Sequence, residues 1–203
     1  MKLYDGGRAP NPRRVRIFFA EKGVALPELV PVDIARKEHK TEAFFRINPA
    51  QRLPVLQLDD GTAIAETIAI CRYIEALHPQ PAMFGRDPKE QATIEMWNRR
   101  VELGLFASVA AVFRHSHPSM VELEDQVPEW AEANRGQVDD HLWLLELQLA
   151  ANLFVCGDVL TVADITAGIA IDFMKPSRIP LPEDFVHIRR WHGELSGRPS
   201  WKV

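Results

Sequence analysis

The stretch from residue 48 to residue 77 constrains the fold more than any other part of the chain. Leu53–Leu58 consists largely of residues that favour extended chain, and it stops at Asp59–Gly61, which predicts a strand entering a tight hairpin turn. Pro54 has no backbone N–H, so it fits the entry of a strand or a sheet edge. X-Pro bonds adopt the cis form at little cost, about 0.5–1 kcal/mol. A cis bond here would turn the backbone N–H and C=O of Leu53 outward, ready to pair with another extended peptide.

A helix follows the predicted hairpin and adds a second binding feature. Ile70, Ile74 and Leu77 repeat at helical spacing, which predicts a helix over Thr67–Leu77. A helix N-terminus has free backbone N–H groups and partial positive charge, which suits a carboxylate, whereas Glu66 beside it suits an ammonium group. Because an α-amino acid carries both charges on one carbon, the pattern predicts a site for a small zwitterionic peptide.

The residues before this stretch predict a small sheet with helices on its faces. Lys2–Tyr4 and Glu28–Ile34 are predicted strands, with Pro31 indicating an edge. The helix between them is expected to have Asn11 as its N-cap and Pro12 at its first position. A β-α-β crossover implies parallel strands and the short turn implies an antiparallel pair. Together they predict a four-stranded mixed sheet.

Two arginines, Arg13 and Arg14, follow Asn11 in the first turn of this helix, where cations oppose the helix dipole. Two interpretations stay open. The side chains are either solvated or paired with a carboxylate elsewhere, or this helix start faces an anion.

The pattern changes to helices alone after about residue 87. Pro79, Pro81 and Pro88 precede a run of apolar residues at i+3/i+4 spacing, which predicts one long helix from about Lys89 to Arg114. Further helices are predicted over Trp130–Ala151, from Thr161 to about Met174, and over about Phe185–Leu195. We therefore expect two domains, 1–80 and 88–203, the second an all-α helical bundle.

The helix that begins at Thr161 is expected to form the buried centre of this bundle. Thr161 and Asp164 have the spacing of a capping box, with Asp in the place of the usual Glu. The residues that follow, Ile165–Ile171, are apolar almost throughout.

Composition and charge exclude several classes of function. A formal net charge of -4 without a Lys/Arg block argues against nucleic acid as a partner. No apolar run approaches the roughly 20 residues of a membrane span, and the N-terminus lacks a signal-peptide pattern, so we expect a cytoplasmic protein. Cys71 and Cys156 are isolated and are expected to be core residues. His115-Ser116-His117 lacks a third ligand, so no metal site is expected.

These motifs, in this order, resemble the cytosolic glutathione transferase family, and the resemblance covers essentially the whole chain. The stretches that carry it are Asn11–Val15, Ile47–Pro49, Leu53–Leu56, Glu66–Ile70, Phe154–Asp158 and Thr161–Ile165. The resemblance implies an α/β thioredoxin-like N-terminal domain that holds glutathione and an all-helical domain that lines the electrophile site. It also implies a homodimer.

The resemblance further implies how glutathione is held. The backbone of Leu53, kept in place by Pro54, would pair with the cysteinyl part of glutathione. Glu66 and Thr67 would take the γ-glutamyl ammonium and carboxylate, in agreement with the charge pattern described above.

The glycine end of glutathione falls on a separate set of residues. Gln51 and Lys40, with His39 as a further candidate, match positions that commonly hold it in the family. An exposed lysine can equally face solvent, so both interpretations of Lys40 stay open.

The catalytic position departs from the family pattern. Related transferases place a Tyr, Ser or Cys near the end of the first strand or the start of the first helix. Here that position falls on Ala9–Asn11, without hydroxyl or thiol, and Tyr4 is expected to be a core residue. The chain resembles a bacterial and fungal subgroup that uses a water held by the helical domain. His115 or Ser116 stands at the matching place, and Asn11 is the other candidate.

Glutathione conjugation to a small apolar electrophile is therefore the leading hypothesis, with Phe106, Phe113 and Trp130 as candidate lining residues. A free thiol titrates near 8.5, and lowering its pKa by about 2 takes roughly 2.7 kcal/mol. A helix N-terminus and one charge-assisted hydrogen bond are enough for that. Two alternatives remain: a glutathione-dependent isomerase or dehalogenase, and a binding or scaffold module without catalysis.

Overall fold

The computed structural model describes residues 1–203 and divides them into two compact units. Unit 1 comprises Met1–Ala82 and Pro199–Val203, and unit 2 comprises Met83–Arg198. The last five residues therefore belong to unit 1, although the sequence grouped them with the helical domain. The guanidinium of Arg13 binds them, because it donates to the backbone carbonyl of Trp201 at 3.0 Å.

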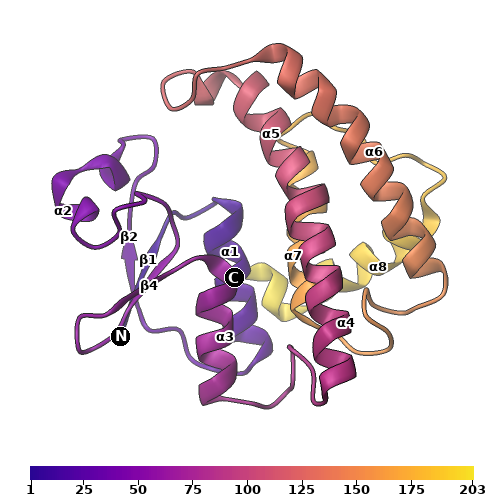
Figure 1. The fold of residues 1–203 in the computed structure, drawn as a ribbon, viewed down its shortest axis with the longest axis horizontal. Coiled ribbons are helices and arrows are strands. Elements are labelled where there is room, and N and C mark those ends of the chain that lie inside the picture. The colour runs from indigo at the N-terminus through magenta and orange to yellow at the C-terminus, as the bar shows by residue number, and fades with distance from the viewer. The chain divides into compact units, whose positions relative to one another are not determined.

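Unit 1 is built on a four-stranded sheet with the strand order β2-β1-β3-β4 (Figure 1). The strands are β1 (Lys2–Asp5), β2 (Glu28–Pro31), β3 (Val55–Gln57) and β4 (Ala63–Ala65). β1 runs parallel to β2 and antiparallel to β3, and β3 and β4 form the antiparallel hairpin. The predicted mixed sheet is confirmed, and β2 lies at an edge. β2 and β3 are both shorter than predicted, since β2 ends at Pro31 and β3 begins only after Pro54.

Helices cover both faces of this sheet. They are α1 (Pro10–Glu21), α2 (Glu42–Phe45) and α3 (Thr67–Leu77), with short 3-10 segments η1 (Glu38–Lys40) and η4 (Pro199–Lys202). Figure 1 shows α1 and α3 on one side of the strands and α2 on the other. Successive strand residues point to opposite faces. Val55 packs on the α2 side with Phe44, while Leu56 is fully buried on the side of α1 and α3.

Helix α1 begins two residues earlier than predicted. Pro10 occupies the first helical position, Ala9 is the N-cap, and Asn11 lies inside the first turn without capping the helix. Proline is pre-organised for the first position by its fixed φ and loses no hydrogen bond there. The prediction that Asn11 caps this helix is therefore wrong.

Unit 2 is entirely helical. Its main elements are α4 (Pro88–Arg99), the π-helical η2 (Arg100–Phe106), α5 (Ala107–Ser116), η3 (Pro118–Met120), α6 (Pro128–Ala150), α7 (Val162–Met174) and α8 (Val186–Gly197). The first three follow one another without a break and form the long helix that the spacing predicted. No helix of the structure is long and apolar enough to cross a membrane.

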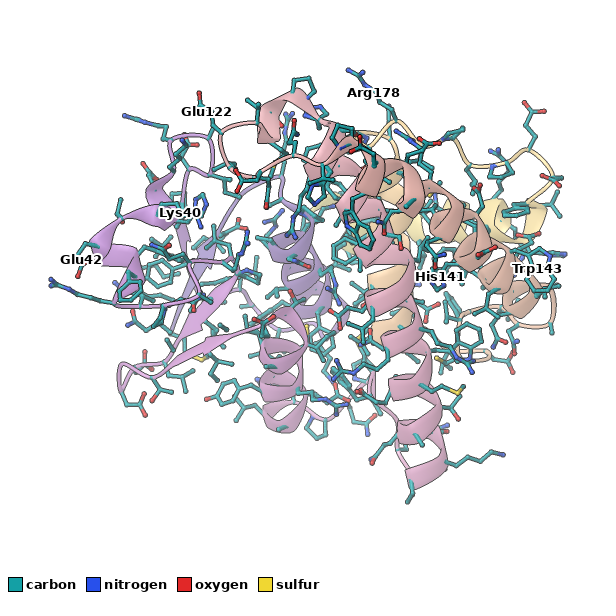
Figure 2. All side chains as sticks on the ribbon, turned by 45° about the horizontal axis from the view of Figure 1, so that its top comes forward. Lys40, Glu42, Glu122, His141, Trp143 and Arg178 are labelled. Atoms are coloured by element: carbon teal, nitrogen blue, oxygen red, sulfur yellow. The ribbon has the colours of Figure 1, made fainter.

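A glycine in the π-helical segment lets two helices approach closely. A Cβ atom at Gly104 would lie 2.5–2.8 Å from the ring atoms of His141, so any larger residue would force the His141 side chain or its helix to shift. His141 lies on α6, and Trp143, two residues further along, is exposed (Figure 2). Gly104 therefore has a packing role.

Helix α7 is buried along most of its length, as the apolar run predicted. Its start carries the predicted capping box, in which the Asp164 carboxylate accepts from the backbone N–H of Thr161 at 2.8 Å. The same carboxylate accepts from the Thr161 hydroxyl, from the backbone N–H of Val155 and from Nε1 of Trp191 at 2.8–3.0 Å. Every donor around this buried group is thus paired with it.

Candidate functional site

Leu53 presents its backbone at the end of the hairpin. The peptide bond to Pro54 is cis. The Leu53 side chain packs on the cluster of Val32, Phe44 and Val55, whereas its backbone N–H and C=O make no hydrogen bond within the chain. Backbone groups of this kind need a partner, and an extended peptide can supply one.

The loop before Leu53 is fixed by a buried side chain. Asn48 is 7% exposed; its Nδ2 donates to the carbonyl of Arg52 at 2.9 Å and its Oδ1 accepts from the backbone N–H of Ala50 at 3.1 Å. Gln51 then takes a left-handed conformation with φ 51°. This conformation is uncommon outside glycine, and the Gln51 side chain is partly buried.

The hairpin brings Glu66 and Thr67 to the same end of the sheet as Leu53. Val55 pairs with Ala65, so the residues just before β3 and just after β4 adjoin each other. Glu66 is exposed, has φ 70°, and precedes α3 without capping it. Strained backbone in a non-glycine residue is typical of ligand-binding positions. Thr67 is buried at the first position of α3.

A buried histidine with two cations near it, Lys40 and Arg52, lies beside the same loop. His39 is 6% exposed, and its Nδ1 has no hydrogen-bond partner. Burial lowers its pKa, and the charges of Lys40 and Arg52 lower it further. Lys40 is exposed (Figure 2). Arg52 was not among the predicted site residues, although its position directly before Leu53 was an available signal.

The start of α1 adjoins Leu53 through Gly6. A Cβ atom at Gly6 would lie 3.2 Å from the Leu53 side chain and 3.4 Å from Cβ of Ala9, so this glycine touches both. Tyr4 is already engaged: its hydroxyl donates to Oε1 of Gln57 at 3.1 Å, and its ring packs edge-on against Phe44. The predicted structural role of Tyr4 agrees with these contacts. Leu53, the Glu66–Thr67 pair, the cationic residues near His39 and the start of α1 thus all belong to the same region of unit 1.

His115 and Ser116 lie at the end of α5 in unit 2. Nδ1 of His115 accepts from the backbone N–H of Val127 at 3.1 Å, so a neutral His115 carries its proton on Nε2. In that state the ring can donate a hydrogen bond but has no free nitrogen to accept a proton. The Ser116 hydroxyl donates to the carbonyl of Val112 at 2.6 Å. Adjacent helical residues point in different directions, so the two side chains do not face each other.

Two of the three candidate lining residues come together in unit 2. The rings of Phe106 and Phe113 both pack on Phe173, with centroid distances of 6.3 and 4.9 Å, and His117 stacks on Phe113 at 4.5 Å. Trp130 is 54% exposed.

The cysteines have no nucleophilic role. Cys71 is buried. Burial, with a smaller contribution from the Asp164 charge, raises the pKa of Cys156 to about 12. The Cys156 thiol therefore stays protonated at neutral pH. The predicted core position is confirmed for Cys71, whereas Cys156 is only partly buried.

The family comparisons match both halves of the chain. The glutathione S-transferase N-terminal domain matches residues 9–77 and the glutathione S-transferase C-terminal domain matches residues 107–199. Glutathione S-transferase 2 of Saccharomyces cerevisiae is 36% identical over 206 residues, which cover 100% of this chain and 88% of that protein.

Solved structures agree with this result. A glutathione S-transferase domain-containing protein from Marinobacter aquaeolei superposes with a TM-score of 0.93 and 39% identity over 98% of this chain and 99% of that chain. Gtt2 from Saccharomyces cerevisiae superposes with a TM-score of 0.92 and 36% identity over 100% and 99%. These matches favour a transferase over the isomerase, dehalogenase and scaffold alternatives. The chain therefore belongs to the glutathione S-transferase family, whose enzymes use glutathione as co-substrate.

Proposed function

We propose that unit 1 binds glutathione and that the enzyme joins its sulfur to a carbon atom of a small apolar electrophile. The observation that carries the proposal is the unpaired Leu53 backbone, which Glu66 and Thr67 adjoin through the hairpin and which directly follows Arg52, a cation close to His39. Glutathione has a zwitterionic head, a central cysteinyl peptide and a terminal carboxylate. The site has a group suited to each of these three parts.

The γ-glutamyl head would bind at the start of α3. Glu66 has no ion-pair partner within the chain, so its carboxylate is available for the ammonium group. The start of α3, where Thr67 lies and no side chain caps the helix, would hold the carboxylate. Leu53, preceded by Gln51 and followed by Pro54, would pair with the cysteinyl peptide.

The glycine carboxylate would lie near His39, Lys40 and Arg52. Three side chains that carry or can carry positive charge suit this anion. A hydrogen bond from His39 Nδ1 to the carboxylate would also give a partner to a buried polar atom that has none within the chain. Gln51 adds an amide donor beside them. The interpretation of Lys40 as a ligand is therefore the better supported one.

The thiol would be activated at the start of α1. Lowering the pKa of the bound thiol from about 8.5 leaves more thiolate at neutral pH. The thiol proton passes to solvent, the sulfur lone pair forms the C–S bond, and the leaving group departs with its bonding electrons. Asn11 is the side chain of α1 best placed to stabilise the thiolate.

The helical unit would contribute the electrophile site. Phe106, Phe113 and Phe173 supply an apolar aromatic surface. His115, with its proton on Nε2, would hold a water by donating to it, and Ser116 could only accept from a water through its oxygen lone pairs. Family membership also supports a homodimer in the cytoplasm.

Isothermal titration calorimetry tests the proposal. We expect glutathione to bind, and cysteinylglycine, which lacks the γ-glutamyl head, to bind at least about 10-fold more weakly, because one charge-assisted hydrogen bond contributes about 1.5–3 kcal/mol. An assay with a panel of apolar electrophiles then identifies the second substrate. Absence of heat at millimolar glutathione would contradict the proposal.

A further inference from the structure

The first turn of α1 offers unusually few backbone donors. Helices normally leave four N–H groups unpaired at this end. Here Pro10 and Pro12 have no N–H, the Ala9 N–H donates to the carbonyl of Gly6, and the Arg13 N–H donates to the carbonyl of Ala9. Only the N–H of Asn11 remains. Stabilisation of an anion at this helix start therefore depends on one residue.

The side chain of Asn11 has a defined orientation. Nη1 of Arg14 donates to Oδ1 of Asn11 at 3.0 Å. A guanidinium group has donors and no acceptor, so the amide must turn its oxygen, and not its nitrogen, toward Arg14. The Nδ2 group of Asn11 makes no hydrogen bond within the chain, so its two N–H donors remain available.

The position of Arg14 makes this orientation rigid. Its side chain is 2% exposed, among the largest fully enclosed side chains of the protein. The interpretation that Arg14 is solvated is therefore wrong. A buried, permanently charged donor holds an amide oxygen more strongly than a neutral one does. Its positive charge is also close to the Asn11 amide, since the two groups are joined by this hydrogen bond.

We propose that Arg14 is a positioning residue: it holds the side-chain amide of Asn11 so that the Nδ2 group of Asn11 donates to the glutathione thiolate. The proposal rests on the function proposed above and names the residue that makes it work. Asn11 acts as a donor at the sulfur, through both its backbone and its side chain, and Arg14 acts through Asn11 without touching the substrate.

Asn11→Asp is the sharpest test, because it preserves the shape of the side chain and the contact with Arg14. It places a carboxylate oxygen where the donor NH₂ was. We expect the pKa of bound glutathione, read from the ultraviolet absorbance of the thiolate, to rise by about 1–2, which follows from losing one charge-assisted hydrogen bond. Asn11→Ala should raise it less. An equal or lower thiol pKa in Asn11→Asp would overturn the proposal.

A double-mutant cycle tests the role of Arg14. Arg14→Lys keeps the charge but removes the planar fork, and it should raise the thiol pKa in the wild-type background and leave it unchanged in the Asn11→Ala background. Arg13→Lys is the matched control, since Arg13 donates to Trp201 and not to Asn11, and it should not change the thiol pKa. Equal effects of Arg14→Lys in both backgrounds would show a general structural role.

The two proposals fail in different ways. Loss of glutathione binding in the wild-type protein contradicts the proposed function. Normal binding, with a thiol pKa that Asn11→Asp does not raise, contradicts only the roles given to Asn11 and Arg14. If Arg14→Lys does not fold, the comparison of Asn11→Ala with the wild-type protein decides, because the truncation adds no charge and raises the thiol pKa only if the Asn11 side chain is a donor to the sulfur.

Discussion

The starts of helices α7 and α1 differ in how their polar groups are satisfied. At α7, the buried carboxylate of Asp164 accepts four hydrogen bonds, from Thr161, Val155 and Trp191. At α1, no side chain caps the helix, and the donors of Asn11 have no partner within the chain. The polar groups of the first start are all paired within the chain, whereas the second keeps donors that we propose bind a ligand.

The start of α3 belongs with α1 in this comparison. No side chain caps it, and Glu66 at its N-cap has φ 70°. Unpaired groups and strained backbone both cost stability, and proteins retain them where a ligand compensates for the cost. The α7 start thus has a complete side-chain cap, whereas the two helix starts that we propose bind glutathione have none.

The largest effect is expected at the α7 start. Asp164→Asn replaces an acceptor oxygen by an NH₂ group that faces other donors, so buried N–H groups lose their partner. We expect a loss of about 3–5 kcal/mol in the free energy of unfolding, measured by urea denaturation. Asp158→Asn, at an exposed position in the same loop, is the control and should stay within about 0.5 kcal/mol. A loss below about 1 kcal/mol in Asp164→Asn would remove the distinction between the two kinds of helix start.

Glu66→Gln should act on binding and leave the fold alone. The side chain is exposed, so we expect a stability change within about 0.5 kcal/mol. Losing the charged partner of the γ-glutamyl ammonium should weaken glutathione binding about 10- to 100-fold by calorimetry. Glu66→Gly is the informative companion, because glycine tolerates positive φ: it should weaken binding similarly without destabilising the fold. Unchanged affinity in both variants would place the γ-glutamyl head elsewhere.

The smallest effect is a pH dependence at His39. Burial, then the charges of Lys40 and Arg52, hold its pKa below the ordinary 6.5. The unfolded chain therefore takes up a proton that the folded protein does not, and stability is lost as the pH falls from about 6.5 toward the folded pKa. His39→Gln should remove this component of the acid destabilisation.

Binding should move the His39 pKa in the opposite direction. A carboxylate next to the imidazole favours its charged form, so glutathione should raise the pKa of His39 in an NMR titration. Glutathione esterified on its glycine carboxylate is the matched ligand and should raise it less. The same pKa with both ligands would mean that the glycine end binds away from His39.

Local patterns predicted the framework of the molecule and part of the site. The hairpin at Asp59–Gly61, the helix Thr67–Leu77 and the capping box at Thr161 were all evident, because turn residues, helical spacing and cap residues act within a few positions of the chain. The long helix from residue 88 was predicted as one element. Its π-helical segment was not predicted, and neither was the close approach of Gly104 to His141 of another helix, which depends on tertiary packing.

The contacts that define the α1 start could not be predicted from the sequence, because they are also tertiary contacts. Nothing in the order of residues shows that Arg14 is buried, that its guanidinium orients Asn11, or that Arg52 lies close enough to His39 to affect its pKa. The grouping of residues 199–203 with unit 1 was missed as well, because it depends on contacts between opposite ends of the chain.

The sequence alone determined the element order, the mixed sheet and the family resemblance, because these follow from short-range periodicity, turn chemistry and motif spacing. Only the tertiary structure decided which polar groups are satisfied and which are left for a ligand. Hydrogen bonds and burial depend on neighbours in space, and a donor at Asn11 is available or occupied according to what folds against it.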